Sequence, residues 1–270
     1  MRLRDILVQL DSSPKTAERL ALALQLAKRG NARLDGVFAQ RASAYQVGVV
    51  AMWPPESYKL AAEASREQFE KAVAGYDNAR WIDLNRGSDH EVTHHLTERA
   101  RHYDLAIVGQ QDEDGPRIVP PEMIEHLIVE SGRPVLVVPY AGHFADAGAR
   151  PLVAWNDARS AARALNDALE FIQPGAKVSV VSMGTGTEAE KASVERIALH
   201  LKSHGFDTEA DYMQVTEVGV MDTLLNLASD KGSDLIVMGA FGGYGYPILN
   251  HGAGTRFMLR HMTVPCLFSH

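Results

Sequence analysis

Short apolar runs alternate along this chain with longer stretches in which apolar residues recur every three or four positions. The short runs have the length of buried strands, and the longer stretches have the period of amphipathic helices. In the first half this pattern predicts strands at 5–10, 32–39, 80–86, 104–109 and 134–139, and helices at 14–29, 56–74, 89–102 and 120–131. Strands that alternate with helices in this way are typical of parallel sheets, so the pattern predicts an α/β fold.

The second half of the chain repeats the first half in the same order. The stretch "DILVQLDSSPKTAERLALAL" near the start is echoed by "RPLVAWNDARSAARALNDAL" from Arg150, and "YDLAIVGQ" is echoed by "SDLIVMGA". A self-similarity of this length indicates duplicated domains. Between the halves lies "YAGHFADAGARP", which is rich in Gly and Ala and has neither period, as short linkers do. We therefore predict two tandem domains, 1–145 and 146–270.

One segment has no counterpart in the second half. Residues 40–55, "QRASAYQVGVVAMWPP", form a longer connection, and Trp53 with two prolines predicts a packed excursion rather than a flexible linker. The segment suggests no particular chemistry.

Composition and charge narrow the class of protein. Hydrophobic residues make up 46% of the 270 positions and charged residues 23%, which is ordinary for a globular protein. No apolar run reaches the roughly 18 residues of a membrane span, and the apolar start of the chain is too short for a signal peptide. The single Cys266 agrees with a reducing compartment, so we expect a cytoplasmic protein without a membrane partner. The net charge of -7 disfavours nucleic acid as a partner.

One short motif suggests a metal. His90-Glu91-x-x-His94 has the spacing of a zinc-protease helix, in which two histidines hold the ion and the glutamate activates water. On the predicted helix, however, the buried stripe contains Val92 and Leu96, so that both histidines point to solvent. The corresponding stretch of the second half, "VMDTLLNLA", has no metal ligand. We therefore expect solvated histidines and no metal site.

The most informative stretch follows a predicted buried strand of the second half. Gly239, Gly242 and Gly252 have the spacing G-x2-G-x9-G, and glycines allow a positive φ and a close approach of backbone N–H groups to an anion. The segment from Gly252 onward is predicted to be a helix, whose N-terminal N–H groups and dipole favour phosphate. Thr255 adds a hydroxyl to its first turn. The alternative interpretation is a glycine-rich loop that only turns tightly after the strand.

Together these features resemble the universal stress proteins, specifically their two-domain form. The features are the glycine spacing, a first strand that ends in Asp11 or Asn156, and the tandem repeat, so the resemblance covers nearly the whole chain. It implies two doubly wound domains, each with a five-stranded parallel sheet of order 3-2-1-4-5 and helices on both faces. It also implies ATP or another adenine nucleotide at the carboxyl ends of the first and fourth strands. Open sheets bind ligands at this switch point on general grounds.

The resemblance assigns the nucleotide site of the second domain to particular positions. Asn156, with Ala154 before it, would face the adenine and ribose, and Met183 would contact adenine through its backbone. The rest of the implied site lies around the end of the fourth strand and the phosphates and comprises Met238, Gly239, Gly242, Gly252, Ala253, Gly254 and Thr255. No residue is assigned a catalytic role.

Three departures from the family pattern bear on affinity. Asn156 replaces an aspartate, so a charged hydrogen bond to ribose becomes a weaker neutral one. Ala253 stands where the family usually has Ser or Thr, so one phosphate-facing hydroxyl is missing. The loop 240–251 contains no Lys or Arg, and only Arg256 lies near enough in the sequence to balance phosphate charge.

The glycine pattern is lost in the first domain. Asp11 fits the family at the end of the first strand, but the positions of the second and third glycines after Gly109 fall on Asp112 and Glu122. Carboxylates at these positions would repel phosphate. We therefore predict a degenerate first domain that has lost nucleotide binding.

Three hypotheses for function follow from the sequence. The first is a universal stress protein that binds ATP, or else AMP or ADP, with or without Mg, in its second domain and acts as a sensor or regulator in the stress response. The second is a slow ATPase or phosphotransferase, for which Asp157 is the only acid close to the phosphates. The third is a nucleotide-free module that binds another protein. A homodimer and an unidentified protein partner fit all three hypotheses, and the first requires no catalysis.

Overall fold

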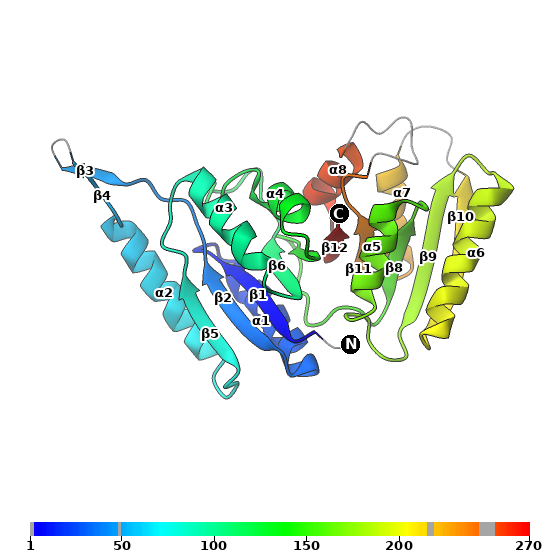
Figure 1. The fold of residues 1–270 in the computed structure, drawn as a ribbon, viewed down its shortest axis with the longest axis horizontal. Helices are drawn as coiled ribbons and strands as arrows, with labels where there is room; N and C mark the ends of the chain where they lie inside the picture. The colour runs from blue at the N-terminus through cyan, green and yellow to red at the C-terminus, as the bar shows by residue number, and fades with distance from the viewer. Residues whose placement is uncertain (1–2, 48–49, 215–218, 243–251) are drawn as a thin grey trace. The chain divides into compact units, whose positions relative to one another are not determined.

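The computed structural model describes residues 3–47, 50–214, 219–242 and 252–270. The chain divides into two compact units, Arg2–Ala145 and Asp146–His270, which we call the N-terminal unit and the C-terminal unit. In each unit, helices cover a central sheet (Figure 1). None of the helices in the described ranges is both long and apolar enough to span a membrane.

The N-terminal unit contains a five-stranded parallel sheet. Its elements, in chain order, are β1 (Asp5–Leu10), α1 (Thr16–Gly30), β2 (Arg33–Phe38), β3 (Tyr45–Val47), β4 (Val50–Met52), α2 (Glu56–Ala72), β5 (Ala79–Asp83), α3 (Asp89–Ala100), β6 (Leu105–Gly109), α4 (Met123–Glu130) and β7 (Val135–Val138). The sheet has the strand order β5-β2-β1-β6-β7, and all neighbouring strands are parallel. The chain changes direction across the sheet between β1 and β6, so their carboxyl ends form the switch point of this unit.

The C-terminal unit has the same arrangement. Its elements are β8 (Pro151–Trp155), α5 (Arg159–Ala168), β9 (Lys177–Gly184), α6 (Glu188–Ser203), β10 (Asp207–Gln214), α7 (Val220–Asp230), β11 (Leu235–Gly239), α8 (Ala253–His261) and β12 (Cys266–Ser269). Its strand order is β10-β9-β8-β11-β12, again parallel throughout, with the switch point between β8 and β11. The predicted fold class, with strand order 3-2-1-4-5 in each sheet and helices on both faces, is therefore confirmed.

The apolar runs form the strands because both faces of each sheet are covered. In β6 the residues Leu105 to Val108 are buried, and in β7 every residue from Val135 to Val138 is buried. A strand covered on both faces needs a continuous apolar run rather than an alternating one. Such runs are recognisable in the sequence, which explains why the predicted strands at 104–109 and 134–139 agree closely with the observed ones.

A repeated aspartate ties neighbouring strands together in both units. The carboxylate of Asp104, before β6, accepts hydrogen bonds from the backbone N–H groups of Arg4 and Asp5 at 2.8 and 3.0 Å. Asp234, before β11, accepts hydrogen bonds from three backbone N–H groups just before β8, at 3.2, 2.8 and 2.9 Å. Charge-assisted bonds of this kind align the starts of the two strands whose carboxyl ends form the switch point.

The segment 40–55 contains a short hairpin that the sequence analysis did not predict. Strands β3 and β4 pair antiparallel within it. Beyond the hairpin, the indole Nε1 of Trp53 donates a hydrogen bond of 2.7 Å to Asn85 Oδ1, and the Trp53 ring lies 4.9 Å from the ring of Tyr58. The tryptophan thus packs against the body of the unit, as expected of a packed excursion.

Candidate functional site

The two histidines of the zinc-like motif lie on the solvent-facing side of α3. Val92 and Leu96 are fully buried, as the helical period predicts, whereas His90 and His94 are exposed and their rings stack 5.7 Å apart. His94 Nε2 lies 3.4 Å from the carboxylate of Glu98, one turn along the helix. Within the part of the chain that the structure describes, no group of three His, Cys, Asp or Glu side chains is placed to hold a metal ion.

Replacing both histidines should therefore have almost no effect on the protein. We expect the double variant His90→Ala/His94→Ala to keep the melting temperature of the parent, because surface substitutions change the free energy of unfolding by about 0.5 kcal/mol or less. Metal analysis of both purified proteins should give the same content. A stoichiometric zinc ion in the parent that disappears in the variant would contradict the assignment of these residues to a solvated face.

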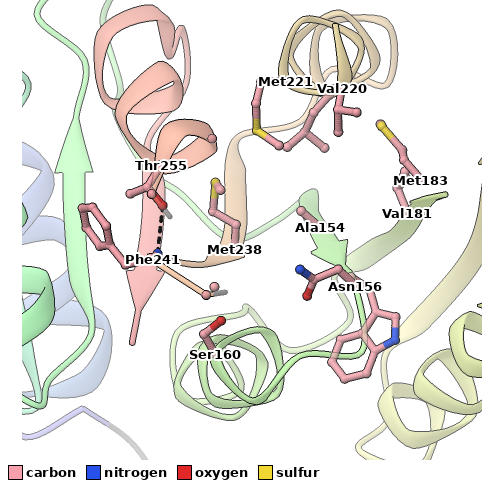
Figure 2. A pocket seen from close by; sticks show the side chains of 16 residues that line it. Ala154, Asn156, Ser160, Val181, Met183, Val220, Met221, Met238, Phe241 and Thr255 are labelled. Carbon is pink, nitrogen blue, oxygen red and sulfur yellow. Dashed lines mark hydrogen bonds between the residues drawn. The ribbon is translucent and has the colours of Figure 1, made fainter. Parts of the chain in front are cut away.

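A cavity opens at the switch point of the C-terminal unit, and Figure 2 shows its side chains. The described residues that line it come from β8, β9, β11 and the N-terminal parts of three helices, and they are Ala154, Trp155, Asn156, Ser160, Val181, Met183, Val220, Met221, Leu224, Met238, Gly239, Phe241, Gly242, Gly252, Gly254 and Thr255. All the site residues that the sequence analysis named are in this set except Ala253. Residues 243–251, which belong to the predicted loop, lie outside the described part of the chain.

One end of the cavity is apolar. Val220 and Met221, at the start of α7, point toward the cavity opposite Met183 and Val181 of β9, and Met238 of β11 lies nearby (Figure 2). The sequence analysis did not identify the contribution of α7. Its stretch "VMDTLLNLA" contains no metal-binding motif, and two apolar residues at a helix start carry no recognisable binding signal.

The other end of the cavity is formed by glycines and hydroxyls, and the glycines serve two different purposes. Gly252 has φ of +86° and is the N-cap of α8, so the predicted positive φ and the predicted helix are both found there. The prediction that Gly242 needs a positive φ is wrong, because the backbone of Gly239 and of Gly242 lies outside the left-handed region. These two glycines provide space instead. A Cβ on Gly239 would lie 2.4 Å from Ala161 N, and one on Gly242 would lie 2.7 Å from Ser160 Oγ.

The start of α8 is held against the loop that follows β11. Thr255 is buried, and its Oγ1 accepts a hydrogen bond of 3.0 Å from the backbone N–H of Phe241 (Figure 2). Phe241 itself has φ of 50°, a strained conformation for a residue with a side chain. The Arg256 guanidinium lies 5.7 Å from the centre of the Phe241 ring. These contacts place a threonine hydroxyl and a helix N-terminus beside the glycines.

Asn156 lies between the two ends of the cavity (Figure 2). Its Oδ1 accepts a hydrogen bond of 3.3 Å from Ala158 N, which leaves the side-chain amide nitrogen to face a ligand. Asp157, the only nearby acid in the sequence, is exposed and does not line the cavity. Among the described lining residues none is acidic or basic, so these residues offer neither a general base nor a carboxylate for a metal ion.

Neither the protein-family models nor the curated proteins include a match to this chain. Solved structures do match. One of them is a universal stress protein from Archaeoglobus fulgidus DSM 4304. The match covers 99% of this chain and 96% of that protein's chain, with a TM-score of 0.72 and a sequence identity of 15%. The chain has the fold of a two-domain universal stress protein. A protein of unknown function from Pseudomonas aeruginosa PAO1 also matches over 99% of this chain and 92% of its own, with a TM-score of 0.58 and 16% identity.

The N-terminal unit has the universal stress protein fold, and a cavity is also present at its switch point, but charged side chains line it and one of them, Arg19, lies directly beside Gly109. Arg19, from α1, is buried, and its Nη1 would lie only 2.0 Å from a Cβ on Gly109. Its Nη2 donates to Asp11 Oδ2 at 2.9 Å and to Thr16 Oγ1 at 3.1 Å, and its Nε donates to the carbonyl oxygen of Gln9 at 2.8 Å. The guanidinium therefore lies at the ends of β1 and β6, so that charged side chains line this cavity, whereas the described residues that line the cavity of the other unit are uncharged.

The Arg19 contact changes the role of Asp11. Burial by itself would raise the pKa of Asp11, but the guanidinium of Arg19 and hydrogen bonds from Ser13 and Thr16 outweigh burial and hold this pKa well below its usual range. Asp11 fits the family pattern in sequence, yet its carboxylate is already paired within the protein. A possible signal in the sequence was the position of Arg19, because the repeat aligns it with Ala164, a buried residue of α5.

Proposed function

We propose that this protein binds an adenine nucleotide, ATP in the first place, in the cavity of the C-terminal unit and acts as a sensor or regulator in the stress response. One observation carries the proposal. A single cavity at the switch point joins an apolar end, suited to a base, to a glycine-lined helix N-terminus, suited to phosphate. The sequence resemblance to universal stress proteins supports the same ligand.

The apolar end fits a flat aromatic base. Met183, Met221 and Met238 surround it, and the polarizable sulfur of methionine makes favourable contacts with aromatic rings. Val181 and Val220 add branched apolar surface on the same walls. A purine placed here would bury both faces against these side chains, while the backbone at the end of β9 would be available to its polar edge.

The glycine end fits a phosphate group. The N-cap of α8 is Gly252, which provides no side-chain cap, so nothing on that residue competes for the first backbone N–H groups of the helix. These N–H groups and the helix dipole attract anions. Ala253 would contribute its backbone N–H here, although its side chain does not line the cavity. Thr255 Oγ1 accepts from Phe241, so the Thr255 hydroxyl proton can be donated to a phosphate oxygen.

The chemistry of the walls supports binding rather than hydrolysis. A phosphoryl-transfer enzyme positions a water molecule or hydroxyl and neutralises charge with a metal ion or cationic side chains. The described lining residues contain no acidic group for either purpose, and Asp157 is exposed and does not line the cavity. The slow ATPase is therefore the second candidate, and any Mg would be held mainly by the nucleotide.

Titration calorimetry with ATP, with and without Mg, tests the proposal on the full chain. We expect one site per chain and no phosphate release above the background in a timed assay of the same sample. Mass spectrometry of the protein as purified should then detect a co-purified adenine nucleotide if the affinity is high. If the parent protein binds no adenine nucleotide, the nucleotide-free interaction module becomes the better hypothesis.

A further inference from the structure

Ser160 is a buried polar side chain that the site described so far does not use. It lies in the first turn of α5 and is 7% exposed. Its side chain points from the helix into the cavity, toward the loop after β11 (Figure 2). Among the residues that the structure describes, its hydroxyl has no hydrogen-bond partner. The oxygen is not one of the fully buried side-chain atoms that lack a partner, and Ser160 lines the cavity, so a ligand atom in the cavity can complete its hydrogen bonding.

The N-terminus of α5 is open on the same side. Its N-cap, Ala158, makes no side-chain hydrogen bond to the helix, and the i to i−4 hydrogen bond of Ala162 N to Ala158 O closes the first turn. The N–H groups of the residues before Ala162 therefore have no partner of that kind within the helix. The backbone nitrogen of Ala161 is also the atom that a Cβ on Gly239 would approach most closely, at 2.4 Å. The absence of a side chain at Gly239 thus lets the start of α5 reach the cavity.

Ser160 and Thr255 approach the same two residues of the loop. Thr255 Oγ1 is bonded to the N–H of Phe241, and Ser160 Oγ lies 2.7 Å from the position of a Cβ on Gly242. Phe241 and Gly242 are consecutive, so their Cα atoms are about 3.8 Å apart. One phosphate chain can therefore reach both hydroxyls and the N-termini of both α5 and α8.

We infer that Ser160 and the start of α5 form a second phosphate subsite, so that the cavity selects an extended di- or triphosphate chain over a monophosphate. The inference rests on the proposed function for the identity of the nucleoside. Two helix N-termini each carry a partial positive charge, and an anion that spans both is stabilised more than one that reaches only α8. Ser160 also supplies a hydroxyl in a cavity where Ala253 lacks one.

The repeat shows that this subsite belongs to the C-terminal unit alone. The alignment of the two halves places Lys15 opposite Ser160, and Lys15 pairs with Glu18 at 3.4 Å. In the N-terminal unit the space beside Gly109 is occupied by the guanidinium of Arg19, whereas the space beside Gly239 receives the uncharged residues Ser160 and Ala161 of α5. A small hydroxyl at position 160 keeps that corner open to a ligand.

The Ser160→Ala variant tests the inference by calorimetry with ATP, ADP and AMP. A hydrogen bond to a charged group contributes enough that we expect a loss of about 10-fold or more for ATP and ADP, with AMP affinity changed by about 2-fold or less. Ser160→Thr, which keeps a hydroxyl, should recover most of the affinity for ATP. Ser229→Ala, an exposed serine of α7 outside the cavity, is the matched control and should bind like the parent. Equal melting temperatures would show that the variants are folded.

Each alternative outcome has a separate meaning. An equal loss of affinity for all three nucleotides would assign Ser160 a structural role, and unchanged ATP affinity would remove it from the site; either result overturns the inference and leaves the proposed function in place. If the parent binds no nucleotide, the proposed function fails, and inorganic tripolyphosphate then tests the subsite. If tripolyphosphate changes the amide chemical shifts of residues 160 and 161 in the parent but not in Ser160→Ala, the result would support the subsite. No response in the parent would overturn it.

Discussion

Arg19→Met is expected to destabilise the N-terminal unit by about 3 to 5 kcal/mol, because it removes one partner of a buried ion pair and leaves the other charge without compensation. The pair is Arg19 Nη2 to Asp11 Oδ2 at 2.9 Å, and both side chains are almost inaccessible to solvent. Methionine roughly replaces the aliphatic part of arginine but provides none of its hydrogen bonds to Gln9 and Thr16. Urea denaturation followed by circular dichroism measures the loss.

A matched control is Lys15, the N-cap of the same helix. Lys15 pairs with Glu18 at 3.4 Å, but both side chains are partly exposed to solvent, so Lys15→Met should change the free energy of unfolding by about 0 to 1 kcal/mol. The double variant Asp11→Leu/Arg19→Met should be more stable than Arg19→Met alone, since no charge is then buried without a partner. Equal, small effects of Arg19→Met and Lys15→Met would contradict the buried pair.

The same pair predicts how stability depends on pH. The pKa of Asp11 is lowered in the folded protein, while in the unfolded chain it is about 3.9. The unfolded state therefore binds the proton more readily, and the stabilisation from Asp11 is fully present above about pH 4 and is lost as the pH falls through the folded pKa. Acid unfolding of Asp11→Asn should accordingly depend less on pH below about pH 4 than that of the parent. Identical slopes would show that the pair does not stabilise the folded state.

Gly242→Val is expected to lower the affinity for ATP on the order of 100-fold, because lost charge-assisted hydrogen bonds each cost about 1.5 to 3 kcal/mol and two such bonds are at risk. The reason is steric. Even a Cβ at this position would lie 2.7 Å from Ser160 Oγ, and the larger side chain would occupy the space between Ser160 and the glycine wall. Since this space belongs to the cavity, the melting temperature should change little. Calorimetry with ATP on the parent and the variant measures the effect.

The matched change in the N-terminal unit is Asp112→Val. The repeat aligns the position of Asp112 with that of Gly242, but Asp112 is exposed and lines a cavity that contains several carboxylates, which repel phosphate. We expect this variant to bind ATP like the parent, with one site per chain in both. Two sites per chain, or an equal loss from the two substitutions, would contradict a single site in the C-terminal unit.

Local patterns in the sequence were sufficient to predict most of the elements. The strand at 5–10 and the helix that follows Gly252 are observed with nearly the predicted bounds, because burial on one stripe or on both faces imposes a period that can be counted along the chain. The resemblance to the universal stress proteins assigned ten positions to a site, and nine of these residues line one cavity. The hairpin of β3 and β4 was missed, because two strands of three residues are too short to show a period.

Only the tertiary structure showed which side chains occupy the two switch points. Arg19 beside Gly109, Ser160 beside Gly242, and Val220 and Met221 opposite Met183 are contacts between segments that are distant in the sequence. Only the tertiary structure also showed that Gly239 and Gly242 are needed because a side chain there would clash with α5, and not because of a positive φ. The sequence by itself determined the elements, because these depend on burial patterns within each segment, and its resemblance to the universal stress proteins implied the strand order. Packing decided which side chains line each site, because that depends on where long side chains from neighbouring helices come to lie.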